Sequence, residues 1–132
     1  MTNTEVPRII IPEDLLFIKY IQVDIGEGAE AFMRLGDPTV RHARFLEDLL
    51  NELGINFKTR KSGGGGMVPV PRGDGYKLVG AGDGRIKILS REIIAFGTSN
   101  SLEYGRGFNQ EHSERITPYL PEGWKLKLER AI

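Results

Sequence analysis

Segments that alternate between apolar and polar residues occupy most of this chain, and they limit the folds that it can adopt. Alternation with a period of two predicts strands, and it recurs in Leu15–Ile25, Glu30–Gly36, Ile55–Lys61, Met67–Ser90, Arg91–Gly97 and Gly123–Arg130. Two stretches have a helical character instead, Pro38–Leu53 and Phe108–Thr117. This order predicts a single α+β domain with one mixed sheet of about six strands and two helices.

Aspartate, glycine and proline mark where elements should begin and end. Asp37 is a candidate N-cap of the first helix, Pro38 fits its first position, and Gly54 fits its end. Turns are predicted at Asp74-Gly75 and at Asp83-Gly84. The remaining glycines are also interpreted as turn residues, although close approach of a ligand to bare backbone is the alternative.

The chain is predicted to be one domain, because 132 residues can bury one core but not two. Residues 1–14 are expected to form an N-terminal tail with a possible short edge strand, and residues 15–132 to form the domain. Arg91–Gly97 is the most apolar strand, which predicts a central position in the sheet. Pro118 should end the second helix near Thr117.

Composition excludes several function classes. Lysine and arginine total 18 and aspartate and glutamate total 18, so no global field would attract nucleic acid or an anionic membrane. Cysteine is absent, which excludes disulfides, thiolate zinc sites and cysteine nucleophiles. Neither a secretory signal nor an apolar run of about 20 residues is visible. We expect a monomeric cytoplasmic protein that binds neither nucleic acid nor membrane.

The glycine-rich stretches do not match known nucleotide or metal motifs. Ser62–Gly66 lacks the lysine and the following helix of a Walker A loop, and "GAGDGR" lacks the spacing of a dinucleotide-binding loop. Asp74 and Asp83 lack the alternating acidic ligands of a calcium loop. With only two histidines and no clustered carboxylates, the sequence indicates no metal site and no cofactor.

His42 and Lys19 are the side chains that could carry chemistry. His42 lies on the inward face of the first helix near its start, where the helix dipole disfavours imidazolium, and a general base must be neutral. A partly buried histidine bonded to a backbone carbonyl would occupy the same position. Lys19 is a lone cation on an apolar strand face, although an edge lysine that reaches solvent would look the same. The small polar residues Thr98–Ser101 could form a backbone anion nest.

Taken in order, these residues resemble the Janus/Ocnus family of small phosphohistidine phosphatases, from about Phe17 to Leu128. Lys19-Tyr20 matches the family's first-strand "KY", and Arg34 stands eight residues before His42, as the family's arginine stands before its catalytic histidine. The "SGGGG" run, the segment "AFGTSNS" and the ending "HSERITPYLPEGWKLKL" match further family segments. Met67 stands where the family often has an arginine.

The resemblance implies a metal-free, cofactor-free phosphohydrolase that cleaves the P–N bond of phosphohistidine or a related phosphoramidate. Its substrate would be a phosphorylated protein or a small phosphoramidate. His42 would be the general base, and the phosphate would be bound by Lys19, Arg34, Ser99, Asn100 and Ser101. For these to form one pocket, the first strand should lie next to the strand that ends at Gly97.

Two other functions stay open. The first is a non-catalytic module that binds phosphate or a phospho-ligand; Met67 favours it and His42 argues against it. The second makes Ser99 or Ser101 an acyl-transfer nucleophile with His42, but the chain lacks the GxSxG elbow and an obvious acid to orient the histidine.

Overall fold

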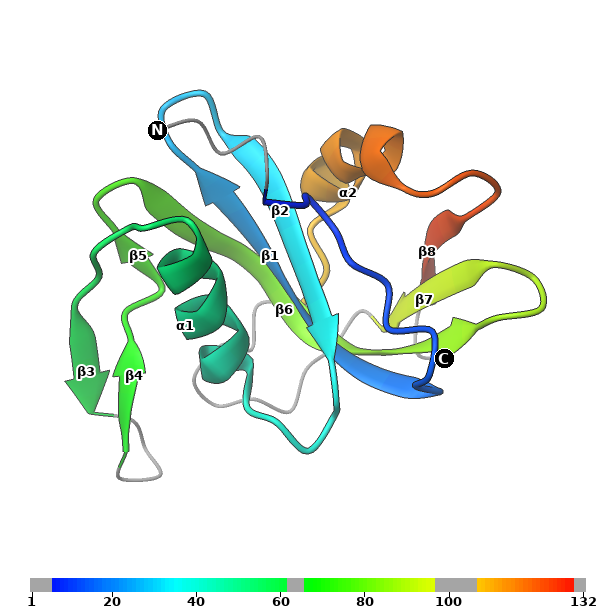
Figure 1. The fold of residues 1–132 in the computed structure, drawn as a ribbon, viewed down its shortest axis with the longest axis horizontal. Helices are drawn as coiled ribbons and strands as arrows, with labels where there is room; N and C mark the ends of the chain where they lie inside the picture. The colour runs from blue at the N-terminus through cyan, green and yellow to red at the C-terminus, as the bar shows by residue number, and fades with distance from the viewer. Residues whose placement is uncertain (1–5, 62–65, 97–106, 130–132) are drawn as a thin grey trace.

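One mixed sheet forms the centre of the protein in a computed structural model, which describes residues 6–61, 66–96 and 107–129 (Figure 1). Its strands lie in the order β2-β1-β6-β7-β8, with the short β5 beside β6. Among the strands of the described segments in this sheet, β7 and β8 are the only parallel pair. The strands are β1 (Phe17–Ile25), β2 (Glu30–Gly36), β5 (Arg72–Gly73), β6 (Tyr76–Lys87), β7 (Glu92–Phe96) and β8 (Lys125–Glu129). The predicted α+β domain with a mixed sheet of about six strands is confirmed.

The two predicted helices cover opposite faces of this sheet. Ile21 and Val23 of β1 share a core with α1 (His42–Glu52). Ile18 and Tyr20 lie in the second core, which includes Ile116 of α2 (Gln110–Ile116). Alternation along β1 therefore puts Lys19 on the α1 face. A 3-10 helix, η2 (Thr117–Tyr119), follows α2, so Pro118 ends the α-helix where predicted.

A second, two-stranded sheet packs beside α1 (Figure 1). It consists of β3 (Thr59–Lys61) and β4 (Met67–Pro69), which are antiparallel. Val68 is buried and joins the α1 core. The predicted strand over Ile55–Lys61 is thus shorter than expected, because only its last three residues pair with β4.

Two predictions about strand placement are wrong. β6, not the strand after Arg91, is central, since β7 lies between β6 and the edge strand β8. The first strand also does not lie next to β7, because β6 separates them. The reason is the length of β6: it pairs with β1 between Tyr76 and Arg85, and its end, from Gly84 to Lys87, pairs with β7.

The predicted turn at Asp74-Gly75 is confirmed, with Gly75 at φ 89°, whereas the one at Asp83-Gly84 is wrong because β6 continues through it. In β6, alternate glycines leave space on one strand face for neighbouring groups. Gln22 packs against Gly80, the Tyr20 ring against Gly82, and the Ile94 carbonyl against Gly84. A side chain at any of these positions would overlap its neighbour.

The start of the first helix also differs from the prediction. The Asp37 carboxylate accepts hydrogen bonds from the N–H and the hydroxyl of Thr39, at 2.8 and 2.7 Å. It therefore closes a turn instead of capping the helix, and α1 begins at His42 with Arg41 as the N-cap residue. The helix ends as predicted, since Gly54 follows it at φ 69°.

The described part of the tail, residues 6–14, lies along β2 without forming a strand. The Arg8 carbonyl accepts a hydrogen bond of 2.7 Å from the Met33 N–H, and Ile9 is buried. None of the helices in the described part of the chain is both long and apolar enough to cross a membrane.

Candidate active site

His42 is the first residue of α1 and is buried, with only 4% of its surface exposed. Its Nε2 lies 2.9 Å from the carbonyl oxygen of Gly82 in β6. Because a carbonyl only accepts hydrogen bonds, Nε2 must carry the proton. In the neutral ring the basic lone pair is then on Nδ1, as a general base requires.

Gly82 is positioned from its other side by Tyr20. A Cβ atom at Gly82 would lie 2.6 Å from the Tyr20 hydroxyl, so only glycine fits between the strands here. The Tyr20 hydroxyl donates a hydrogen bond of 3.0 Å to the carbonyl of Phe96, the last residue of β7. Burial, with a smaller effect of Asp83, raises the pKa of Tyr20, so its hydroxyl stays protonated.

Lys19 lies on the same sheet face as α1 and at the same end as His42. It pairs with Asp83 of β6 and with Gly36 of β2, and Asp83 directly follows the glycine that binds His42. Lys19 is half-buried. Within the described segments, no carboxylate forms an ion pair with its ammonium.

Arg34 is held away from His42. It is buried, and its Nη1 donates hydrogen bonds to the carbonyls of Met33 and Arg8, at 3.0 and 3.3 Å. Its Nη2 lies 3.5 Å from a Glu52 carboxylate oxygen, an ion pair without hydrogen-bond geometry. Burial lowers the Arg34 pKa despite this carboxylate. Glu52 ends α1, about 15 Å along the helix from His42. The contacts of Arg34 therefore join the N-terminal segment, β2 and the far end of α1.

Ser99, Asn100 and Ser101 lie outside the described residues, but both flanks of their segment are described. Phe96 is held by the Tyr20 hydroxyl. Gly107 exchanges two backbone hydrogen bonds with Ala81, at 3.0 and 3.1 Å. Both flanks are thus anchored close to Gly82, the residue that binds His42.

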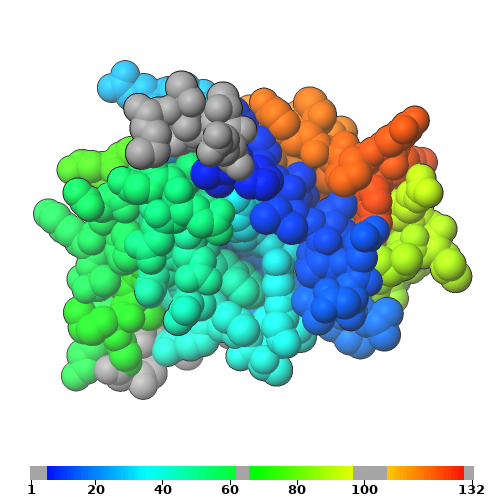
Figure 2. Space-filling model, in the orientation of Figure 1, coloured from blue at the N-terminus to red at the C-terminus, as the bar shows by residue number. Residues whose placement is uncertain are grey.

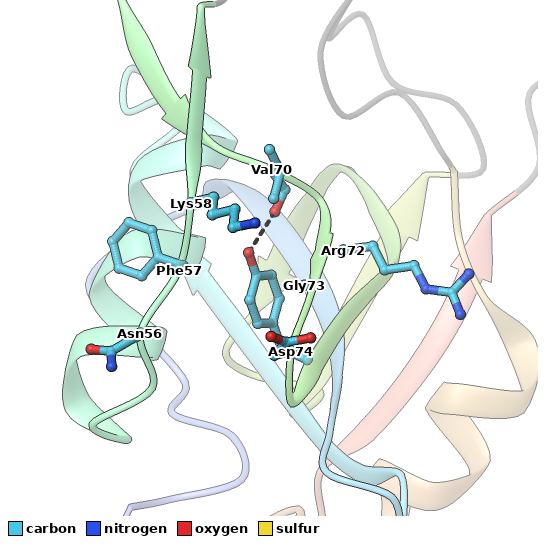
Figure 3. A pocket seen from close by; sticks show the side chains of 8 residues that line it. Asn56, Phe57, Lys58, Val70, Arg72, Gly73 and Asp74 are labelled. Carbon is cyan, nitrogen blue, oxygen red and sulfur yellow. Dashed lines mark hydrogen bonds between the residues drawn. The ribbon is translucent and has the colours of Figure 1, made fainter.

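A cavity of about 540 Å³ lies elsewhere, beside the turn between β5 and β6 (Figure 3). The Tyr76 hydroxyl donates a hydrogen bond of 3.0 Å to the Val70 carbonyl there. None of the predicted site residues lines this cavity, which is formed by Asn56, Phe57, Lys58, Val70, Arg72, Gly73, Asp74 and Tyr76.

Gly82 and Tyr20 were not predicted from the sequence to be part of the site. The signal for Gly82 was present, because Gly80, Gly82 and Gly84 recur at the strand period of two and mark one crowded strand face. Tyr20 was noted only as part of the Lys19-Tyr20 pair, and its contact with Gly82 was not predicted. Across the described residues, no three histidine, aspartate or glutamate side chains lie together as a metal-binding group.

No protein-family model matches the chain, and no curated protein matches it.

Proposed function

We propose that this protein is a phosphohydrolase that cleaves the P–N bond of phosphohistidine or a related phosphoramidate. The observation that carries the proposal is the place of His42: it starts α1 at the end of the sheet where Lys19 and the anchored flanks of residues 99–101 lie. The bond from Nε2 to the Gly82 carbonyl is also the one expected of a purely structural histidine, and a His42→Gln variant separates the two roles. The resemblance to Janus/Ocnus phosphatases supports the same chemistry.

The proposed reaction needs few groups. His42 Nδ1 takes a proton from a water molecule, whose oxygen attacks phosphorus. The substrate's imidazole enters the step already protonated on its other ring nitrogen, so when the P–N bond breaks, the electron pair of that bond leaves on a neutral imidazole. His42 keeps the proton taken from water and afterwards releases it to solvent. A positioned base contributes typically about 10²–10⁴-fold to such a step. No metal ion or cofactor is part of the proposal.

Phosphate binding is assigned to Lys19 and to backbone amides near Ser99, Asn100 and Ser101. Lys19 supports this assignment through its place on the α1 face, and the loop does so through its anchored flanks. Donors fixed by the fold stabilise developing charge at little reorganisation cost. The hydrogen bonds of Arg34 to two backbone carbonyls and its ion pair with Glu52 favour a structural role.

The test is release of inorganic phosphate from a phosphohistidine peptide, with p-nitrophenyl phosphate as a P–O comparison. The proposal expects faster turnover of the P–N substrate, and turnover that persists in EDTA. Phosphate binding without any phosphate release would identify the alternative, a non-catalytic binding module. Labelling by a fluorophosphonate probe would instead support a serine nucleophile.

A cytoplasmic location belongs to the same proposal. Fractionation of cells that express a tagged chain tests it.

A further inference from the structure

A long stretch of this neutral chain carries only positive charge. Between Leu53 and Gly73 there is no aspartate or glutamate, and the cations are Lys58, Arg60, Lys61 and Arg72. Several arginines elsewhere are compensated, as Arg8 is by Glu30 and Arg115 by Asp24. For Arg60 and Lys61, the described residues supply no carboxylate partner.

Arg60 and Lys61 belong to a strand with an open edge. All three residues of β3 are exposed. Across the described part of the chain, β3 pairs only with β4, and it lies at the outer margin of the molecule in Figure 1. Figure 2 shows this end of the molecule in green at the left. An open strand edge offers backbone donors and acceptors to an added extended segment.

One end of the β3–β4 pair lies near the start of α1, where His42 is. Lys61 pairs with Met67 across the hairpin, and Gly66, just before Met67, lies close to the Arg41 guanidinium, 3.7 Å from a Cβ built on it. Arg41 is the residue before His42. Met67 is 62% exposed, so this end of the hairpin also offers an adaptable apolar contact.

We infer that β3 docks an extended, acidic segment of the phosphorylated substrate polypeptide. We call the docking surface, made of Arg60, Lys61 and Met67, the hairpin edge. Carboxylates of the bound segment would lie against Arg60 and Lys61, with its backbone along β3 and its phosphohistidine directed to His42. This inference rests on the proposed function and names its substrate class.

A polypeptide fits the hairpin edge better than a nucleic acid does. The whole chain has no net charge, whereas nucleic-acid binding depends on broad phosphate neutralisation. Single-stranded nucleic acid also needs aromatic stacking platforms, and no residue of β3 or β4 is aromatic. A strand edge matches an extended peptide backbone.

The test compares three substrates: a phosphohistidine peptide flanked by glutamates, the same peptide flanked by serines, and phosphoramidate itself. The variant is the double charge reversal Arg60→Glu with Lys61→Glu. Lys125→Glu is the control, a charge reversal at an exposed lysine of β8, an edge strand of the other sheet.

For the glutamate peptide, the double variant should raise KM by at least about fivefold and leave kcat nearly unchanged. This effect should shrink at high ionic strength. The phosphoramidate rates, and both peptides with Lys125→Glu, should stay at parent values. If edge cations serve only to prevent aggregation, acidic and serine peptides will behave alike, and the inference is overturned. Competition by an oligonucleotide as strong as that by the acidic peptide also overturns it.

A further measurement separates a wrong docking surface from a wrong phosphohydrolase assignment. If the parent releases phosphate from none of the three substrates, fluorescence anisotropy of a labelled, unphosphorylated glutamate peptide decides. If the peptide binds, and if the double charge reversal weakens this binding while Lys125→Glu does not, the hairpin edge is a docking surface of a protein that does not catalyse the reaction. No binding up to millimolar peptide overturns the docking inference as well.

Discussion

At the scale of single residues, Lys19 and Arg34 are both cations on the α1 face, but their contacts differ. Arg34 is nearly enclosed, donates to two backbone carbonyls and faces Glu52. Lys19 is half-buried at the end of the sheet where His42 lies. The spacing of Arg34 from His42 suggested one shared site, but spacing along a strand and a turn does not fix where a long side chain ends.

Alanine at these two positions should therefore have different effects. Lys19→Ala should weaken phosphate binding by about 1.5–3 kcal/mol and change the free energy of unfolding by less than about 0.5 kcal/mol. Arg34→Ala should lower the free energy of unfolding by about 1–3 kcal/mol, because it removes the donors of buried carbonyls. Urea unfolding and phosphate titration measure both. If Arg34→Ala weakens phosphate binding and leaves stability unchanged, Arg34 is a ligand.

At the scale of elements, β6 joins the candidate site to the core. One face of Gly82 is packed against Tyr20, while its carbonyl orients His42. The sequence predicted β1, β2 and both helices from the period-two and helical patterns of their residues, although β1 and β2 turned out to be buried on both faces. The prediction was wrong at β6. There the glycines were interpreted as turn residues, whereas they are needed because groups of the neighbouring strands lie too close for a side chain.

Gly82→Ala should disturb both the packing and the site. The new methyl group would lie 2.6 Å from the Tyr20 hydroxyl, and such overpacking typically costs about 1–3 kcal/mol. Turnover per folded molecule should also fall, because the displaced carbonyl no longer fixes the His42 proton. Gly28→Ala is the matched control, since no atom lies within 4 Å of its added Cβ. Equal melting temperatures and rates for the two variants would contradict this account of Gly82.

At the scale of the whole molecule, a buried polar network holds α2 against β1. His112 is fully buried; its Nε2 donates to the Val23 carbonyl, at 3.1 Å, and its Nδ1 lies 3.4 Å from the Gln22 amide nitrogen. The Gln22 oxygen in turn accepts from the Asn109 N–H. A proton on Nδ1 would face the Gln22 amide hydrogens. Such long-range partners are not visible in the sequence, where His112 lies 90 residues from Gln22.

Stability should consequently fall in mild acid. Burial lowers the pKa of His112 by more than the hydrogen bond to the Val23 carbonyl and the nearby Asp24 raise it, and Arg115 lowers it further. The unfolded chain, with a histidine pKa of about 6.5, then binds the proton more readily than the folded chain. Above that pH His112 is neutral in both the folded and the unfolded chain, so it adds nothing to the pH dependence of the free energy of unfolding. Below that pH, stability should fall by up to about 1.4 kcal/mol per pH unit until the folded-state pKa is passed. His112→Gln should flatten this dependence in urea unfolding; an unchanged slope would contradict it.

Comparing variants of the two histidines tests directly whether His42 is the base of a phosphohydrolase. His42→Gln preserves a donor for the Gly82 carbonyl but has no basic nitrogen, and His112→Gln is the matched loss of the other buried histidine. Phosphohistidine turnover should be measured per folded molecule for both variants, beside melting temperature and phosphate affinity. We expect His42→Gln to lose at least about a hundredfold in kcat with phosphate affinity retained, and His112→Gln to turn over like the parent. Parent-like turnover by His42→Gln would contradict the assignment of His42 as the base.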